Sequence, residues 1–259
     1  MTRYVALGSS MAAGPGIAPR VPGSPRAALR SARNYPHLLA ADLGLEPGPE
    51  FVDVSFSGAT TAHLLTQAQL GAPPQVEALD GTETLVTITI GGNDVFYVPG
   101  LLVATFPRPL RLLPVVGPRL RHALDPTARQ VALAELGRSM RAVGRAVRRR
   151  SPRARVVFVD YLTLLPPPGQ AAFPLRERYV DQGRRTAERL ASITAEAAAA
   201  TGCELVGAGA ASREHHAWSK DPWSVGATVP GPGRPLAYHP NAAGMRAVAD
   251  LLAAHLAAD

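Results

Sequence analysis

The first ten residues hold the feature that most constrains this chain, a short apolar strand followed at once by a serine. Residues 4–7 form an apolar, β-prone run of the kind that buried parallel strands show, and Gly8 permits a tight exit from it. Ser10 then stands where the strand gives way to a helix. In open α/β sheets, ligands bind in the crevice outside the carboxyl ends of the strands. The run therefore predicts a hydroxyl group at a ligand site, although Ser9 or Ser10 alone is also typical of a helix cap.

Four further apolar runs predict strands, and amphipathic runs between them predict helices. We expect strands over 51–54, 84–90, 155–159 and 203–206, and helices over 34–43, 126–150, 175–201 and 240–258. Strands that alternate with helices favour a parallel sheet that is covered on both faces. The sequence thus predicts an α/β protein with three layers, α/β/α, built on a parallel sheet of about five strands.

Size and composition predict a single domain over residues 1–259. The chain has 46% hydrophobic and 18% charged residues, which suffices for one sizeable core, and its composition shows no shift that would divide it. Residues 97–118 stand out because they contain five prolines among leucines and valines. Such a long connection is typical of a lid or a binding loop, or else of a surface excursion without a role. We expect an insertion here that acts as a lid or offers an apolar binding site.

The ends of the chain and its single cysteine bear on where the protein works. Cys203 alone cannot form an internal disulfide framework, so nothing requires an oxidising compartment. The amino terminus reaches the first strand by residue 4 without the features of a signal peptide. No apolar run approaches the roughly 18 residues that span a bilayer. We therefore expect a cytoplasmic protein without a transmembrane segment.

The charge of the chain is strongly positive and is concentrated in one region. The net charge is +7, and thirteen arginines but only two acidic residues lie between Arg108 and Arg155. A basic patch can bind nucleic acid, but aromatic residues are too sparse there for a platform on which bases would stack. We interpret the arginines as a solvated helix face and expect no nucleic-acid partner.

Three of the predicted strands end in turns of small residues, and a histidine stands near the carboxyl end of the chain. Taken in order, Gly8-Ser9-Ser10-Met11, Gly58, Gly91-Gly92-Asn93-Asp94 and His239-Pro240-Asn241 resemble the motifs of the SGNH (GDSL-type) esterases and lipases. The resemblance implies the SGNH hydrolase fold, with a flavodoxin-like sheet. It also implies that Ser10 is the nucleophile and His239 the base, and that Gly58, Asn93 and the Ser10 amide form an oxyanion hole.

The residue types agree with these roles on chemical grounds. A serine hydroxyl is a poor nucleophile until an adjacent base takes its proton, and histidine suits that task near neutral pH. Pro240 after His239 favours a helix start, where the dipole would keep the imidazole neutral. The Asn93 amide can donate to the negative oxygen of a tetrahedral intermediate, although it could also cap the next helix, a role that suits Asp94 better.

The sequence departs from the family pattern at two positions. Ser9 stands where the family name has aspartate, and Leu236 stands where the family usually has the aspartate of Asp-x-x-His. Because a leucine side chain has no acceptor, we predict that the backbone carbonyl of Leu236 orients the imidazole of His239. Asp221, in the preceding loop, is the alternative.

These observations predict a carboxylic ester hydrolase that works through an acyl-enzyme at Ser10. The alternative is an acyltransferase, or a non-catalytic relative that binds an acylated ligand in the same pocket. We expect no cofactor, and no metal site either, because the spacings of metal ligands are absent from the sequence. The expected partner is a small-molecule or lipid-like ester.

Overall fold

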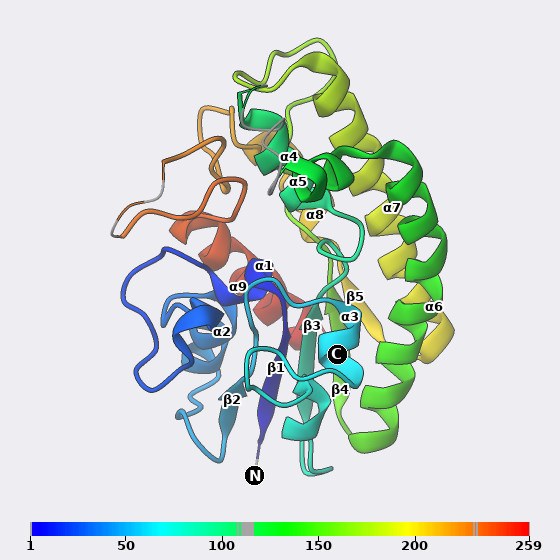
Figure 1. Cartoon of the computed structure of the whole chain (residues 1–259). Helices are drawn as coiled ribbons and strands as arrows, with labels where there is room; N and C mark the ends of the chain where they lie inside the picture. The colour runs from blue at the N-terminus through cyan, green and yellow to red at the C-terminus, as the bar shows by residue number, and fades with distance from the viewer. Residues whose placement is uncertain (1, 108, 110–116, 230, 232, 259) are drawn as a thin grey trace.

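A parallel five-stranded sheet forms the middle layer of the protein, and helices cover both of its faces (Figure 1). The computed structural model describes residues 2–107, 109, 117–229, 231 and 233–258. The strands lie in the order β2-β1-β3-β4-β5, and each pair of neighbours is parallel. Their bounds are β1 Tyr4–Gly8, β2 Phe51–Asp53, β3 Leu85–Thr89, β4 Arg155–Val159 and β5 Glu204–Val206. Every predicted strand is present, and each is within one residue of the predicted bounds at either end.

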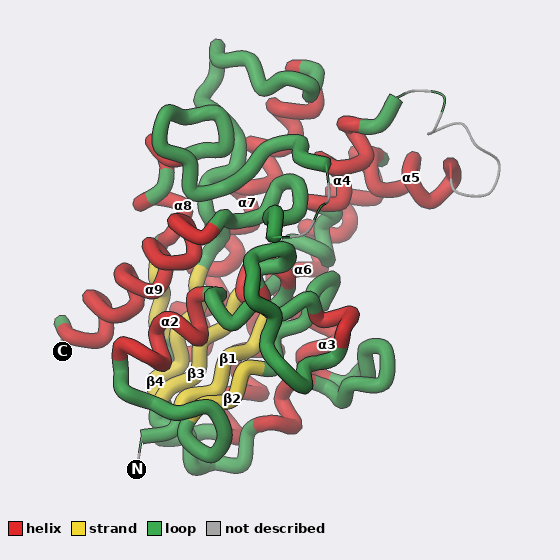
Figure 2. Tube along the Cα trace, turned by 90° about the vertical axis from the view of Figure 1, so that its left-hand side faces the viewer, coloured by secondary structure: helices red, strands yellow, loops and turns green. Residues whose placement is uncertain are grey.

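The helices fall into two layers, in agreement with the three-layer prediction. Figure 2 shows α2 and α9 on one face of the sheet, with α6 behind the other face. The helical segments are α1 Ser10–Ala13, η1 Arg26–Ala28, α2 Tyr35–Asp42, α3 Thr61–Leu65, η2 Gln75–Ala78, α4 Tyr97–Thr105, α5 Gly117–Leu124, α6 Pro126–Arg150, α7 Glu177–Thr201, α8 Ala208–Ala211, η4 Arg213–His215 and α9 Ala242–Ala257. In the described part of the chain, no helix is both long enough and apolar enough to cross a membrane.

The two faces of the sheet build two separate cores. Alternate residues of a strand point to opposite faces, so Val5 and Leu7 of β1 join the core under α6 and α7, while Tyr4 and Ala6 join the core under α2 and α9. All five residues of β1 are buried. The central strand thus has no exposed face, which is why its sequence is a continuous apolar run and not an alternating one.

The segment predicted as an irregular insertion over 97–118 contains regular structure. Helix α4 begins with Tyr97, and α5 occupies the end of the segment. In α4, Val98 and Leu101 are buried in the core under α6 and α7, whereas Leu102 is exposed. The apolar residues of α4 therefore serve the core and do not form a free lid. Residues 108 and 110–116 of the predicted insertion lie outside the described residues.

The carboxyl end of β1 approaches β3 unusually closely. A Cβ atom at Gly8 would lie 2.8 Å from the Thr89 carbonyl oxygen and 2.9 Å from the Ala12 Cβ. The buried side chain of Gln75 completes the pairing here, because its amide accepts from the Gly8 N–H at 2.7 Å and donates to the Gly8 carbonyl at 3.0 Å. Glycine is thus required by packing at this point, in addition to the tight exit that the sequence indicates.

We predict that Gly8→Ala destabilises the protein by about 1–3 kcal/mol, the usual cost of forcing a carbon into a filled space. The control is Gly207→Ala, because the nearest atom to a Cβ at Gly207 is 3.9 Å away and its φ is negative. That change should alter the free energy of unfolding by less than about 0.5 kcal/mol. Urea denaturation of both variants measures the difference. Equal effects would show that the approach of β1 to β3 is not tightly packed.

Candidate active site

The two serines after β1 have different surroundings. Ser9 is the residue before α1, and its hydroxyl lies 3.1 Å from the hydroxyl of Tyr161. Ser10 begins α1 and is only 7% exposed. Among the described residues, its hydroxyl has no hydrogen-bond partner. Ser9 is therefore occupied by a structural contact, while the Ser10 hydroxyl is available to react.

The turns after β2 and β3 are joined through Asn93. The Asn93 side-chain amide donates to the Ala59 carbonyl at 2.8 Å, which places it against the turn that contains Gly58. Gly58 has a φ of +80°, a conformation that favours glycine. The nearest atom to a Cβ at Gly58 would be 3.6 Å away, so its conformation, and not crowding, requires glycine. The structure brings together the two residues that the sequence predicts as oxyanion donors.

Asp94 fixes the same two turns from the other side. Its carboxylate accepts from the backbone N–H of Thr61 at 3.1 and 3.2 Å and from the Thr61 hydroxyl at 2.6 Å. Burial raises the pKa of Asp94, and its hydrogen bonds to Thr61 oppose that rise. The sequence analysis expected Asp94 to cap the helix that follows it. In the structure it binds the start of α3, while Phe96 precedes α4.

Tyr161, which follows β4, is a site residue that the sequence analysis missed. Its hydroxyl contacts the Ser9 hydroxyl and accepts from the Gly92 N–H at 3.0 Å. A Cβ at Gly92 would lie 2.9 Å from the Tyr161 ring, so this glycine makes room for the tyrosine. Tyr161 therefore ties the turn of the nucleophile to the turn of Asn93. An aromatic residue two positions after a predicted strand was the only signal in the sequence.

His239 is oriented by a backbone carbonyl, but not by the one predicted. Its ring Nδ1 lies 2.8 Å from the carbonyl oxygen of Ala237, whereas the Leu236 carbonyl accepts from the backbone N–H of His239 at 3.2 Å. The prediction of Leu236 as the acceptor for the ring is therefore corrected to Ala237. Asp221, the alternative, lies beside His215, with its Oδ2 3.5 Å from the His215 ring.

The local backbone explains why Ala237 replaces Leu236. Tyr238, between Ala237 and His239, has a φ of +61°, and this left-handed turn brings the Ala237 carbonyl back to the His239 ring. The turn also shifts the helix start, because α9 begins at Ala242 with Asn241 as its cap. Pro240 therefore lies outside the helix, contrary to the expectation that it begins the first turn. Burial lowers the pKa of His239, and its hydrogen bonds to the Ala237 and Leu236 carbonyls oppose that shift.

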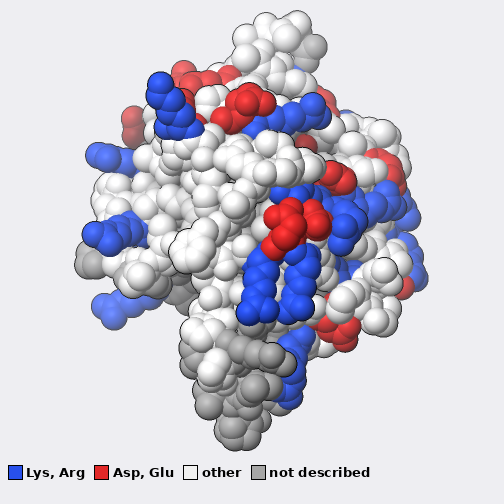
Figure 3. Space-filling view, turned by 90° about the horizontal axis from the view of Figure 1, so that it is seen from above, with Lys and Arg blue, Asp and Glu red and all other residues white. Residues whose placement is uncertain are grey.

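The segment before His239 runs beside the residues that follow α1. The Leu236 N–H donates to the Pro15 carbonyl at 3.1 Å, and a Cβ at Gly16 would collide with the Arg234 carbonyl. Ser10 and His239, which are far apart in the sequence, thus come to the same edge of the sheet, where the strands end. Figure 3 looks onto this end of the molecule and shows acidic and basic side chains around a broad uncharged area.

The comparisons with known proteins identify the family. The sequence model of the GDSL-like Lipase/Acylhydrolase family matches residues 6–247, nearly the whole chain. The chain belongs to the GDSL-like lipase/acylhydrolase family. It is 29% identical over 243 residues to a lipase of Streptomyces rimosus, covering 94% of this chain and 82% of that protein. A 43% identical match to Lipase 2 of Streptomyces coelicolor spans 35% of this chain and 29% of that protein.

Solved structures of GDSL-like relatives share the fold. The extracellular lipase from Streptomyces rimosus has a TM-score of 0.76 at 26% identity, covering 98% of this chain and 99% of that chain. Phospholipase A1 from Streptomyces albidoflavus has a TM-score of 0.76 at 27% identity, covering 98% of both chains. These matches confirm the predicted fold and family. The chain is a carboxylic ester hydrolase of the SGNH type.

Metal ligands do not gather in the part of this hydrolase that the structure describes. No group of three or more histidine, cysteine, aspartate or glutamate side chains is placed there to hold a metal ion.

We predict that Tyr161→Phe destabilises the protein by about 1–3 kcal/mol, because it leaves the buried Gly92 N–H without its acceptor. Tyr97→Phe is a matched control. Its ring packs edge-on against Tyr161 with centroids 6.4 Å apart, but its buried hydroxyl has no hydrogen-bond partner. Losing that hydroxyl should be neutral or stabilising. Thermal and urea unfolding of both variants measures the contrast, and similar losses in the two would refute the bridging role of Tyr161.

Proposed function

We propose that the protein hydrolyses carboxylic esters through an acyl-enzyme, with Ser10 as the nucleophile and His239 as the general base. The observation that carries the proposal is the division of roles after β1, where Ser9 is bound by Tyr161 and the Ser10 hydroxyl is left without a partner among the described residues. The Ala237 carbonyl supports the second role. As the acceptor for Nδ1–H, it favours the neutral tautomer in which Nε2 carries a lone pair.

In the first step, His239 Nε2 takes the proton of the Ser10 hydroxyl as its oxygen attacks the ester carbonyl carbon. Three donors stabilise the resulting oxyanion. The Gly58 N–H and the Ser10 N–H come from backbone, and the latter lies in the first turn of α1, where N–H groups have no partner within the helix. The third donor is Asn93. Its amide has two N–H groups, so one can bind the Ala59 carbonyl while the other faces the oxyanion.

The intermediate then collapses, and the alcohol leaves with the proton that His239 returns. Water, activated by the same imidazole, attacks the acyl group on Ser10 and releases the acid. In the described part of the chain no aspartate stabilises the imidazolium, because the acceptor for Nδ1–H is the neutral Ala237 carbonyl. This site therefore depends on geometry and on the oxyanion donors more than a site with a full triad does.

Relatives and local shape together suggest lipid-like esters as substrates. The similar proteins are a lipase and a phospholipase A1. Tyr161, whose hydroxyl contacts Ser9, also lines a cavity of about 600 Å³. Its wall includes Leu162, Leu164 and Leu165 together with charged residues, and it is reached from the site through Tyr161 and not through Ser10 or His239. We assign this cavity to the acyl chain. A panel of p-nitrophenyl esters of increasing chain length tests the assignment, which requires kcat/KM to rise beyond the acetyl ester.

We predict that Ser10→Ala abolishes ester hydrolysis and labelling by a serine-directed phosphonate, without loss of fold. The comparison variant Ser9→Ala should keep most of its activity, because it loses only the contact with Tyr161. Hydrolysis rates and mass spectrometry of the labelled protein give both readouts. Labelling without hydrolysis, together with ester formation in added alcohol, would indicate an acyltransferase. Activity that survives Ser10→Ala would refute the proposed nucleophile.

We predict that the acid limb of kcat/KM has its midpoint below pH 6.5, the ordinary pKa of histidine, because burial lowers the pKa of His239. The base works when neutral, so activity persists as the pH falls until it reaches this lowered pKa. Asp160 is a competing source of such a limb, since burial raises its pKa to about 6. Asp160→Asn should leave the midpoint unchanged when p-nitrophenyl butyrate hydrolysis is followed. A limb that disappears in this variant would assign the titration to Asp160.

A further inference from the structure

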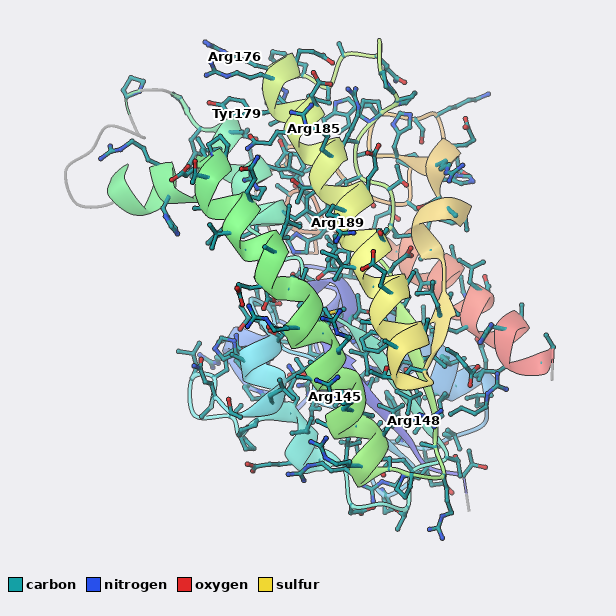
Figure 4. The ribbon with its side chains drawn as sticks, turned by 90° about the vertical axis from the view of Figure 1, so that its right-hand side faces the viewer. Arg145, Arg148, Arg176, Tyr179, Arg185 and Arg189 are labelled. Carbon is teal, nitrogen blue, oxygen red and sulfur yellow. The ribbon has the colours of Figure 1, made fainter. Side chains whose placement is uncertain are left out.

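A groove between α6 and α7 carries an unusual concentration of positive charge. It encloses a cavity of about 540 Å³ whose lining includes Arg129, Arg178 and Arg185, two glutamines, and the apolar surfaces of Leu133 and Tyr179. The lining residues of α6 recur at helical spacing, as do those of α7, so two helix faces form its walls. Figure 4 shows Tyr179 and Arg185 on the upper part of α7, beside the upper part of α6.

This groove has little counter-charge of its own, and Asp125, which precedes α6, is the acidic residue that interacts electrostatically with Arg129. None of its lining residues is acidic. Among the described residues, no carboxylate lies within ion-pair distance of Arg129, Arg178 or Arg185. The neighbouring Arg184 is the opposite case, since it pairs with Asp181 at 2.7 Å and with a second acid. Of the two α7 arginines that line the groove, Arg178 lies over the Tyr179 ring and donates to the Tyr179 hydroxyl at 3.0 Å, and neither Arg178 nor Arg185 has an acidic partner among the described residues.

Arg129 is the most informative of the three because it is buried. It is 6% exposed, and its guanidinium donates to the carbonyls of Val95 at 3.2 Å and Ala123 at 2.6 Å. Gly100 of α4 makes room for it, since a Cβ there would lie 2.6 Å from the guanidinium. Two carbonyls orient the cation but do not neutralise it. A buried charge without an opposite charge is costly, so a site of this kind favours an anionic occupant.

The helices themselves add to the positive field. α6 begins at Pro126 and α7 at Glu177, and each is 25 residues long. Both helices start at the end of the molecule where the groove lies, so the positive ends of two long dipoles are directed to the same region. Glu177, in the first turn of α7, is engaged by Arg184 at 3.2 Å and does not line the groove.

We propose that this groove binds the phosphate group of an organic phosphate that has an apolar body. Guanidinium groups bind phosphate oxygens through paired hydrogen bonds, and three arginines with Gln130 and Gln182 supply more donors than a carboxylate can accept. The cavity is also larger than a bare phosphate ion needs, and Leu124 and Leu133 line it with apolar side chains that can contact an apolar body. The site is separate from Ser10, and it does not depend on the proposed catalytic mechanism.

Octyl phosphate is a suitable probe because it has no carboxylic ester for the enzyme to hydrolyse. Its dissociation constant is measured by calorimetry for the wild type and for Arg178→Gln/Arg185→Gln, two exposed positions whose change should leave the fold intact. We expect the variant to bind about tenfold or more weakly, as loss of charged hydrogen bonds implies. Octanoate should bind the wild type at least about tenfold more weakly than octyl phosphate.

The matched control is Arg145→Gln/Arg149→Gln, which removes the same charge from exposed positions near the carboxyl end of α6. Figure 4 shows Arg145 on the lower part of this helix. It should change octyl phosphate affinity by less than about twofold, because long-range attraction is screened by salt. Equal weakening by the two double variants would reduce the effect to net charge and overturn the site. Absent binding, or octanoate affinity equal to that of octyl phosphate, would also overturn it. Should the groove variant unfold, Arg185→Gln alone takes its place.

Two further probes distinguish a lipid from a soluble ligand. Vesicles of ether-linked phosphatidylcholine, with and without dihexadecyl phosphate, present the phosphate on a surface, while glycerol 3-phosphate presents it in solution. Groove-dependent sedimentation only with the vesicles that contain dihexadecyl phosphate supports the proposal with a lipid as the source. Glycerol 3-phosphate binding as tight as that of octyl phosphate would overturn the apolar part of the proposal.

Discussion

The close approach of β1 to β3 at Gly8 is the constraint on which the candidate active site depends. There, the Ser9 N–H donates to the Thr89 carbonyl at 2.9 Å, and the Phe56 N–H donates to the Gly8 carbonyl at 3.0 Å. The end of β1 is thus fixed on both sides at the point where Ser10 follows. The Ser10 hydroxyl must be placed accurately against an ester carbon, and it needs such a rigid support because small misplacements strongly reduce the rate of reaction.

The turns that follow β1, β2 and β3 are joined to one another by hydrogen bonds. Tyr161 connects the first turn to the third, and Asn93 and Asp94 connect the third to the second. Donors that are held in place before the substrate arrives stabilise an oxyanion better than donors that must reorganise. In this hydrolase the hydrogen bonds that hold the turns thus also prepare the oxyanion hole. Preorganisation matters more here because the acceptor that supports His239 is a neutral carbonyl and not a carboxylate.

The sheet was predictable from sequence, because buried parallel strands are apolar runs and small residues mark their ends. Ser10, Gly58, Asn93 and His239 were named from the resemblance of their motifs to those of the SGNH esterases, and their catalytic roles stay predictions, as does the cytoplasmic location. Two features could not be predicted from the sequence because they depend on tertiary contacts. Five prolines among leucines and valines marked 97–118 as a long connection, yet α4 forms there because its apolar side chains are buried in the core. Tyr161 was missed because a tyrosine after a strand has many possible partners, and only the fold selects Ser9 and Gly92.

The wrong prediction for Leu236 has a different cause. It depends on the backbone conformation of Tyr238, which a tyrosine disfavours. A tyrosine at positive φ costs about 1–3 kcal/mol, so no local rule predicts it at position 238. The surroundings impose it: the Tyr238 N–H donates to the Val225 and Gly226 carbonyls, and its ring is fully buried. Without the left-handed turn, the Ala237 carbonyl would not point back to His239.

The far end of the Tyr238 side chain is also held, and the hydrogen-bond directions can be deduced. The Thr105 hydroxyl donates its one proton to the Leu101 carbonyl at 3.0 Å, so the Tyr238 hydroxyl, 2.5 Å away, must be the donor to Thr105. Thr105 ends α4, and α4 begins four residues after Asn93. A single short helix therefore joins the turn of the oxyanion donor to the strained turn that orients the base. The apolar side chains of α4, which the sequence predicted as part of a lid, are instead buried in the core and hold this connecting helix in place.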